Sequence, residues 1–239
     1  MDIRKATAAD IQDIAKVLLA ATASESQWLY CFPSRREHPE KHESRVKAAL
    51  ELCLSTPDGW IVAVAEISQG RGQHPKQIVA VGIWQTQAPD PKGHGKSDAP
   101  EDSWSQLVGS DTQEGSDCHP SHLTTFMSAS ALGREKYLRK YDPQIHLHIL
   151  ATHPNHQKLG FGKALCNWGI SWASEKKMTV SVMASSKGYI FFSGMGFRDV
   201  GYVTVKAEGE SEDRALKAMV RVAGPERRRS SVLHFLGLD

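Results

Sequence analysis

The stretch HLHILATHPNHQKLGFGKAL, residues 146–165, decides the fold. It opens as an apolar run of strand length in which His146 and His148 lie two residues apart. A short turn with two glycines follows, and residues 161–175 then have helical spacing. The apolar stripe of this helix is formed by Leu165, Trp168 and Trp172. The stretch therefore predicts a strand, a glycine turn and a helix in direct succession.

The glycine turn, QKLGFG at residues 157–162, has the composition of an anion site. The first backbone N–H groups of a helix lack intrahelical partners, and the helix dipole favours a negative charge there. Gly160 and Gly162 let a phosphate approach the backbone closely, while Lys158 and Lys163 add positive charge. The alternative interpretation is a tight strand-to-helix turn that uses glycine only for its conformation.

Two common phosphate-binding motifs fit the sequence poorly. A dinucleotide-binding fingerprint needs a small residue at the position of Leu165. A P-loop needs GxxxxGK[ST], and the segment GHGKS at residues 93–97 has the right end, but Asp90 stands where the first glycine belongs. The sequence therefore favours neither a dinucleotide site nor a nucleoside triphosphate site.

Strand and helix patterns continue on both sides of this stretch. Strands are predicted at residues 2–6, 60–67, 77–86, 145–152, 179–185, 197–206 and 215–223. Helices are predicted after a capping box of Thr7 and Asp10, and within residues 39–54, 121–141, 161–175 and 188–196. The order of these elements predicts one α/β (α+β) domain over residues 1–239. Its central sheet is expected to be mixed, partly antiparallel, of about six to seven strands, and flanked by helices.

Segment 88–121 interrupts this pattern. It is rich in Gly, Pro, Ser and Asp and poor in apolar residues, which is typical of a low-order insertion. A loop of this length inside a compact domain is either functional or disordered. The two strands before it, 60–67 and 77–86, are apolar on both faces, so helices are expected to cover both sides of the sheet.

Composition argues against several classes of protein. The formal net charge of +2 is too small for a protein that binds nucleic acid mainly through charge, and the run of arginines at 227–229 is interpreted as a solvated tail. No apolar stretch approaches the ~20 residues of a membrane span, and the N-terminus lacks the pattern of a signal peptide. The four cysteines are widely spaced without CxxC, which predicts free thiols and a cytoplasmic protein. Cys118, His119 and His122 lack a fourth ligand, so no metal site is expected.

The motif Q-x-x-G-x-G, residues 157–162, follows a strand that ends in LATHP, and this arrangement resembles the acyl-CoA-binding motif of the GNAT superfamily of N-acyltransferases. The resemblance covers most of the chain outside 88–121, including GYIFFSGMGF at residues 188–197. The strand HLHILATH, residues 146–153, is most similar to the arylalkylamine N-acetyltransferases. The resemblance implies a GNAT-like fold and an acetyl-CoA-dependent N-acetyltransferase without a metal. Its expected acceptor is a small-molecule amine, and a monomer or homodimer is expected.

The same resemblance implies which residues hold coenzyme A. Backbone groups near Leu150 to Thr152 would hold the pantetheine arm, and amides from Leu159 to Lys163 would hold the pyrophosphate. The implied cofactor-binding residues are Leu150, Ala151, Thr152, Gln157, Lys158, Leu159, Gly160, Phe161, Gly162, Lys163 and Phe192.

The two strand histidines are the candidate general bases. Residues two apart on a strand point to the same face, so His146 and His148 are expected to share one side with Leu150 and Thr152. An aliphatic amine is protonated near neutral pH and must lose a proton before it attacks a thioester, and an imidazole with a pKa of about 6.5 suits that task. The alternative is a pair of neutral, hydrogen-bonded histidines that only pack. The resemblance favours a catalytic role for at least one of them.

The sequence departs from the family at Phe192. Many members carry a tyrosine there, whose hydroxyl protonates the leaving thiolate, and phenylalanine has no proton to give. Tyr189, one helical turn earlier, is the candidate replacement, with a packing role as the alternative. The departure keeps two other functions open: a non-catalytic acyl-CoA-binding sensor or scaffold, and a repurposed GNAT-fold enzyme with other acyl chemistry.

Overall fold

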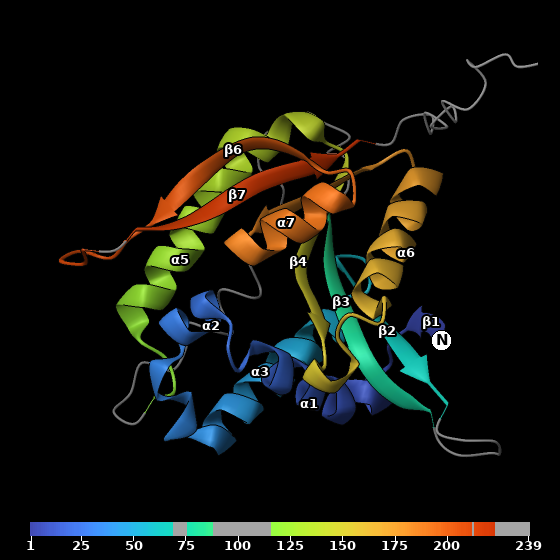
Figure 1. The fold of residues 1–239 in the computed structure, drawn as a ribbon, viewed down its shortest axis with the longest axis horizontal. Helices are drawn as coiled ribbons and strands as arrows, with labels where there is room; N and C mark the ends of the chain where they lie inside the picture. The colour runs from blue at the N-terminus through green and yellow to red at the C-terminus, as the bar shows by residue number, and fades with distance from the viewer. Residues whose placement is uncertain (69–75, 88–115, 212, 223–239) are drawn as a thin grey trace, which may run out of the picture.

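Seven strands form one mixed sheet (Figure 1). The computed structural model describes residues 1–68, 76–87, 116–211 and 213–222. The strands are β1 (Asp2–Lys5), β2 (Trp60–Ile67), β3 (Gln77–Gln87), β4 (Gln144–Thr152), β5 (Thr179–Ala184), β6 (Arg198–Val205) and β7 (Arg214–Arg221). Their order across the sheet is β1-β2-β3-β4-β5-β7-β6. β4 and β5 are parallel, and the other neighbouring pairs are antiparallel.

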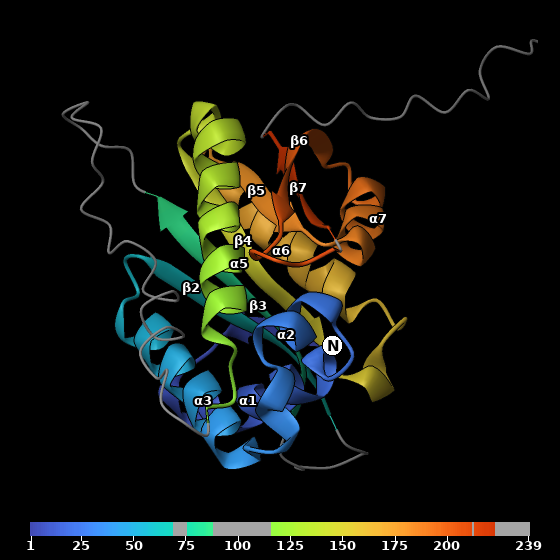
Figure 2. The same ribbon diagram turned by 90° about the vertical axis from the view of Figure 1, so that its left-hand side faces the viewer.

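Helices cover both faces of the sheet, as the apolar strands predicted. The α-helices are α1 (Ile11–Thr22), α2 (Ser26–Cys31), α3 (Pro39–Ser55), α5 (Pro120–Gly133), α6 (Phe161–Glu175) and α7 (Ser186–Gly194). One face packs against α6 and α7, and the other packs against α1 and α3 and, further along the sheet, α2 and α5 (Figure 2). The predicted helix at 121–141 is α-helical only to Gly133 and continues as a π-helical turn, η3 (Arg134–Leu138). The predicted fold class is confirmed.

The centre of the sheet is built around Trp84 on β3. This side chain is 1% exposed and packs toward α6, in one cluster with Leu147 and Leu165. Its indole lies so close to Gly82 and Gly169 that a Cβ atom at either position would come within 2.7 Å of the ring. The two glycines therefore make the space that this indole fills between β3 and α6.

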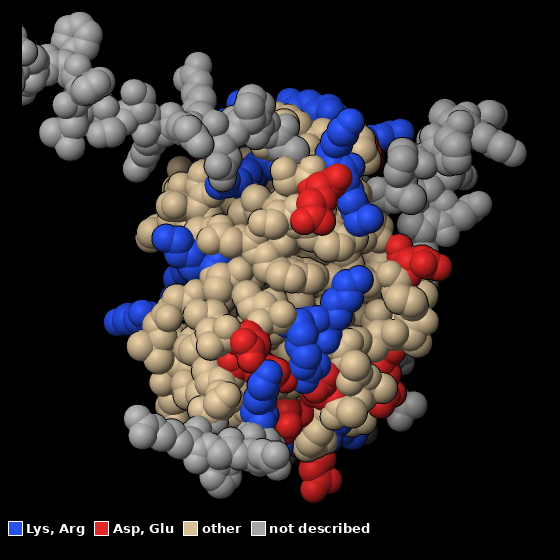
Figure 3. All heavy atoms as spheres, turned by 90° about the vertical axis from the view of Figure 1, so that its right-hand side faces the viewer, with Lys and Arg blue, Asp and Glu red and all other residues tan. Residues whose placement is uncertain are grey.

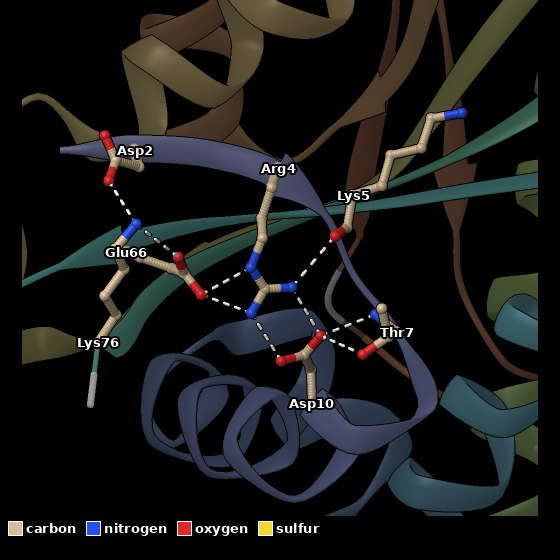
Figure 4. Close-up of polar contacts among 7 residues, drawn as sticks. All are labelled: Asp2, Arg4, Lys5, Thr7, Asp10, Glu66 and Lys76. Atoms are coloured by element: carbon tan, nitrogen blue, oxygen red, sulfur yellow. Dashed lines mark hydrogen bonds and ion pairs between the residues drawn. The ribbon is translucent and has the colours of Figure 1, made fainter.

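Arg4 ties β1 to β2 and to the start of α1 (Figure 4). Its guanidinium donates to Glu66 at 2.8 Å and to both carboxylate oxygens of Asp10 at 2.7 and 2.8 Å. The Asp10 carboxylate also accepts the backbone N–H of Thr7, which confirms the predicted capping pair. The hydrogen bond from Arg4 is the main cause of the lowered pKa of Asp10. A short edge strand is thus held by a charge-assisted network.

The predicted low-order segment 88–121 is wrong at its C-terminal end. Residues 88–115 lie outside the described part of the chain, as does the predicted basic tail at 227–229. Within 116–121, however, Asp117 and Cys118 are buried and α5 begins at Pro120. Asp117 has no exposed surface and accepts hydrogen bonds from His42 at 2.7 Å and from Arg45 at 2.8 Å. Trp28 donates its indole N–H to the other nitrogen of His42 at 2.9 Å, so His42 is neutral and gives its Nδ1 proton to Asp117. The polar composition of this segment does not indicate that Asp117 is buried, where it links the start of α5 to α2 and α3.

Replacing Asp117 with asparagine should cost about 2 kcal/mol of folding stability at pH 7. Burial raises the pKa of Asp117, but the hydrogen bonds from His42 and Arg45 outweigh burial and lower it from 3.8 to about 2. A lowered carboxyl pKa stabilises the fold above 3.8, and this stability is lost as the pH falls toward 2. Urea unfolding of both proteins between pH 7 and pH 3 should show the stability difference shrinking on the acid side. The control Asp13→Asn removes a surface pair with Lys16 and should have little effect at any pH. A difference for Asp117→Asn that is constant with pH would contradict the assignment.

No described helix has the length and apolar character needed to cross a membrane. Figure 3 shows the face that carries α6, where basic and acidic side chains are interspersed among uncharged ones. The four cysteines are free thiols, as the spacing predicted, and all four are buried.

Candidate active site

The parallel strands β4 and β5 separate partway along their length. They are paired from Gln144 and Thr179 to Leu147 and Val182. Beyond this point β4 continues to Thr152 and leads into the glycine turn, while β5 ends at Ala184 and leads into α7. A cleft of about 540 Å³ opens here. Its lining residues are Glu25, Leu150, Thr152, His156, Gln157, Lys158, Gly160, Phe161, Gly162, Lys163, Ser185, Lys187, Gly188, Phe191 and Phe192.

The start of α6 forms one wall of the cleft and is suited to an anion. Gly160 precedes the helix with φ +90°, a left-handed conformation, and a Cβ atom there would meet no other atom within 4 Å. Glycine is therefore needed for its backbone conformation, not because a side chain would lack space. The first N–H groups of α6 lie at this end, and Lys158, Lys163 and Lys187 line the same cleft.

Most of the side chains predicted for the cofactor site come together. Leu150, Thr152, Gln157, Lys158, Gly160, Phe161, Gly162, Lys163 and Phe192 all line the cleft. Ala151 and Leu159 do not: the first packs on the opposite face of the sheet with α1 and α3, and the second is 62% exposed. These two residues can face the cleft only through their backbone.

Six lining residues were not predicted from the sequence: Glu25, His156, Ser185, Lys187, Gly188 and Phe191. Ser185 to Gly188 form the start of α7, where the Ser185 hydroxyl accepts the N–H of Gly188 at 3.1 Å. A serine three residues before a helical glycine was the available signal for this capped start. Glu25 reaches the cleft from the α1–α2 connection and pairs with Lys187 at 3.0 Å. No local pattern in the sequence predicts this contact between Glu25 and Lys187.

The predicted common face of the two histidines with Leu150 and Thr152 is wrong, because β4 carries a β-bulge. Ile83 on β3 pairs with Ile149, but the next residue, Trp84, pairs with Leu147, which leaves His148 as the extra residue. Leu147 and Leu150 consequently share the α6 face although they are three residues apart. The bulge turns His148 to the opposite face from Leu150. The histidines thus lie behind the cleft, on the side of α1 and α5.

His146 and His148 have different surroundings. His146 is 3% exposed and its Nδ1 lies 2.9 Å from the hydroxyl of Ser181 on β5, where the strands are still paired. His148 is half-buried and lies one residue past the last position paired with β5. Its Nε2 is 3.0 Å from the amide oxygen of Gln85. The two rings meet edge to face with their centroids 4.8 Å apart. His148 therefore stands at the point where the sheet opens.

Burial lowers the pKa of both histidines well below 6.5, and the positive charge of Arg134 lowers it further. His146 is also affected by His148. The rings are consequently neutral at pH 7, and each keeps one nitrogen lone pair that can accept a proton.

Tyr189 lies apart from the cleft. Its ring is half-buried beside Lys217 on β7, with the ammonium 5.6 Å from the ring centroid, and it is not among the lining residues. Phe192 does line the cleft, where its ring packs on Phe197. The structure thus brings the apolar ring to the site and leaves the candidate acid outside it.

The remaining cluster singled out in the sequence is aromatic. His119 and His122 stack at 3.8 Å, and His122 stacks on Tyr30 at 4.1 Å. Within the described residues, no group of three or more His, Cys, Asp or Glu side chains is arranged to hold a metal ion.

A mixed seven-stranded sheet flanked by helices, opened between its parallel strands, defines the fold as that of the GNAT class. Residues 90–197 match the model of the acetyltransferase (GNAT) family. Residues 90–197 thus match the sequence pattern of a GNAT acetyltransferase domain, as the motifs suggested. Enzymes of this family are acyltransferases that use acetyl-CoA.

Solved structures of known proteins share the fold. An acetyltransferase from Corynebacterium glutamicum, described as histone acetyltransferase HPA2 and related acetyltransferase, is 22% identical, with a TM-score of 0.58 over 94% of this chain and 97% of that one. Mosquito arylalkylamine N-acetyltransferase like 5b is 14% identical, with a TM-score of 0.59 over 92% and 99%. The polyamine N-acetyltransferase of Drosophila melanogaster, which forms N-acetylagmatine, is 16% identical, with a TM-score of 0.59 over 92% and 99%. A comparison with curated proteins gave no match.

Proposed function

We propose that the protein is an acetyl-CoA-dependent N-acetyltransferase that acts on a small-molecule primary amine. The observation that carries this proposal is the position of His148 at the opening between β4 and β5. The cleft lies on one face of the sheet and the histidine lies on the other, about two residues apart along the same strand. The similar folds of enzymes named for arylalkylamines and polyamines support an amine as the acceptor.

The residues of the cleft fit coenzyme A. The open space at Gly160 and the start of α6 would receive the pyrophosphate, with positive charge from Lys158, Lys163 and Lys187. Leu150 and Thr152 lie on the part of β4 that extends beyond its pairing with β5, where backbone groups not bonded to β5 would hold the amides of the pantetheine arm. Coenzyme A would supply the acyl group as a reactive thioester.

The chemical role of the protein in this reaction is to remove a proton from the acceptor amine. The ammonium form of the acceptor loses one proton to the free nitrogen of His148, directly or through water, and the amine nitrogen then attacks the thioester carbon. A C–N bond forms, the C–S bond breaks, and the second proton of the nitrogen ends on the departing sulfur or in solvent. His148 is favoured over His146 because it is half-buried at the opening, whereas His146 is buried and bonded to Ser181.

Thiolate departure does not depend on a tyrosine in this proposal. Phe192 cannot give a proton, and Tyr189 lies outside the lining of the cleft. The proton reaches the sulfur from water or from the amine. Tyr189→Phe should therefore leave turnover nearly unchanged, as measured by released thiol across pH. Loss of turnover with intact acetyl-CoA binding would show that Tyr189 is the acid after all.

A panel of amines with acetyl-CoA tests the proposed function. Purified protein should release thiol and form an equal amount of acetylated amine with at least one arylalkylamine or polyamine. The alternative function, an acyl-CoA-binding sensor or scaffold, is favoured by Phe192 in the cleft. This alternative predicts that acetyl-CoA binds but that no amine in the panel is acetylated. That outcome would contradict the proposed enzymatic function.

Gly160→Val should lose most of the coenzyme A affinity while the protein remains folded. A β-branched residue at φ +90° is strained, so the turn must shift and the amides at the start of α6 move with it. Thermal unfolding with and without ligand measures the effect, because a ligand at 100 times its Kd adds about 2.7 kcal/mol of stability. Wild type should be stabilised by coenzyme A far more than by ATP or NAD, and the variant should not respond. Gly194→Val is the control, since Gly194 ends α7 and has φ outside the left-handed region. An unchanged response of Gly160→Val would place the phosphates elsewhere.

A further inference from the structure

A row of side chains crosses the sheet behind the cleft. Trp60 on β2 pairs with Gln85 on β3, Gln85 pairs with His146 on β4, and His146 pairs with Ser181 on β5. Three of the four are polar and buried, with Gln85 5%, His146 3% and Ser181 0% exposed. Buried polar groups need partners, and the bulge adds His148 to the same row.

Gln85 connects this row to a charge from outside the sheet. Its amide oxygen accepts an N–H of the Arg134 guanidinium at 2.8 Å and lies 3.0 Å from Nε2 of His148. Arg134 is the first residue of η3, the π-helical turn that follows α5. The chain of contacts therefore runs from Arg134 through Gln85 to His148.

The donors and acceptors of these hydrogen bonds determine which nitrogen of the His148 ring carries the proton. A guanidinium has only donors, so the Gln85 atom that faces it is the oxygen. That same oxygen can only accept from His148, so Nε2 of His148 carries the proton. Nδ1 of His148 is then the nitrogen with the free lone pair.

We propose that Arg134 and Gln85 are positioning residues that hold His148 in its neutral Nε2–H form, with Nδ1 ready to accept the proton of the amine. This inference rests on the proposed role of His148 as the base. Gln85 fixes the ring orientation and the tautomer through its oxygen. Arg134 fixes the orientation of Gln85 and, by its charge, opposes protonation of the ring.

The electrostatic surroundings of His148 support this role. Among the described residues, the charged and titratable groups that face it are Arg134 from η3 and His146 from β4. Trp60 on β2 adds an uncharged ring at 4.9 Å, and Gln85 on β3 is uncharged. Burial and Arg134 both lower the pKa of His148, and no described carboxylate faces the ring to offset them. Removing the charge of Arg134 or adding a carboxylate at position 85 should therefore raise the pKa.

The test combines two substitutions with two readouts. Gln85→Glu puts a carboxylate between Arg134 and His148, and Arg134→Gln removes the positive charge. Both should move the acid limb of the rate to higher pH, by about one pH unit or more for the carboxylate. In the absence of substrates, the ¹⁵N spectrum of the His148 ring should show the Nε2–H form in the wild type and a midpoint of protonation that rises in both variants. If Gln85→Glu fails to fold, Arg134→Gln still decides the matter.

Arg139→Gln is the matched control. Arg139 lies about one turn after Arg134 and pairs with Glu135 on the surface, where both side chains are more than half exposed. Its pH profile and ring spectrum should equal those of the wild type. A purely structural role for Arg134 and Gln85 predicts lower stability and a lower rate at every pH, with the acid limb and the midpoint unmoved.

Two results would overturn the inference: an Nδ1–H form of His148 in the wild type, or an unchanged midpoint in the folded variants. The spectra require no turnover, so they separate this inference from the proposed function. If the midpoints rise but no amine is acetylated, the spectra support the contacts and protons assigned to Arg134, Gln85 and His148. The lack of turnover would then count against the proposed function alone.

Discussion

Replacing His148 with glutamine should lower turnover by roughly 10²–10⁴-fold, with little change in acetyl-CoA affinity. Glutamine keeps a polar side chain of similar reach but cannot take up a proton near neutral pH. The cofactor cleft should be undisturbed, because His148 lies on the opposite face of the sheet from Leu150. Steady-state rates from released thiol, together with acetyl-CoA binding measured separately, give the two quantities.

The pH dependence of the turnover rate tests the same role of His148. A base works only when it is unprotonated, so the rate should fall as the pH drops through the pKa of His148. Because burial and Arg134 lower that pKa, the acid limb should lie below pH 6.5. His148→Gln should abolish the limb, and His146→Gln should have a smaller effect on the rate. His38→Gln is the control, because His38 occupies the N-cap position of α3 but its side chain makes no capping hydrogen bond. A His148→Gln variant that turns over at the wild-type rate would remove His148 from the mechanism.

Trp84→Ala should destabilise the fold by about 3–5 kcal/mol. The indole is 1% exposed and fills the space that Gly82 and Gly169 leave between β3 and α6. Its removal leaves a cavity that the neighbouring glycines cannot fill. Gly169→Ala tests the same contact from the other side, because the new methyl group would meet the indole at 2.7 Å and should cost about 1–3 kcal/mol.

The matched control for this prediction is Trp172→Ala on α6. Trp172 is only half-buried and contacts Lys176 at 4.9 Å from the ring centroid, so its removal leaves no enclosed cavity. Urea unfolding of the three variants measures the free energies of unfolding. The packing described for Trp84 would be refuted by a loss no larger in Trp84→Ala than in Trp172→Ala.

The sequence predicted most of the fold because the strongest patterns are local. The helix at 161–175 and the strand at 60–67 occur at the predicted bounds, since helical and strand periodicity are clear there. The glycine turn was identified for the same reason: a strand, two glycines and a helix stand next to one another in the chain. Gly160 has the left-handed conformation that such a turn requires.

The parts that the sequence did not predict depend on contacts between distant residues. The alternating sequence pattern of a strand cannot predict the bulge at His148, because the bulge depends on how β4 pairs with β3. Asp117 lies in a polar segment, and its burial depends on contacts with His42 and Arg45, which lie 75 and 72 residues earlier in the sequence. Glu25 reaches the cleft only because α2 and α7 meet in the fold. Residue types were enough to predict most of the side chains that line the cleft, but the face of the sheet to which each side chain points depends on the fold.

The structure of the complex with acetyl-CoA is the most direct test of the central claim. We expect the pyrophosphate at the amides from Leu159 to Lys163 and the pantetheine arm beside Leu150 and Thr152. The thioester carbon should lie at the opening between β4 and β5, with Nδ1 of His148 facing it from the other side of the sheet. A thioester far from this opening, or a cofactor bound outside the cleft, would contradict the account.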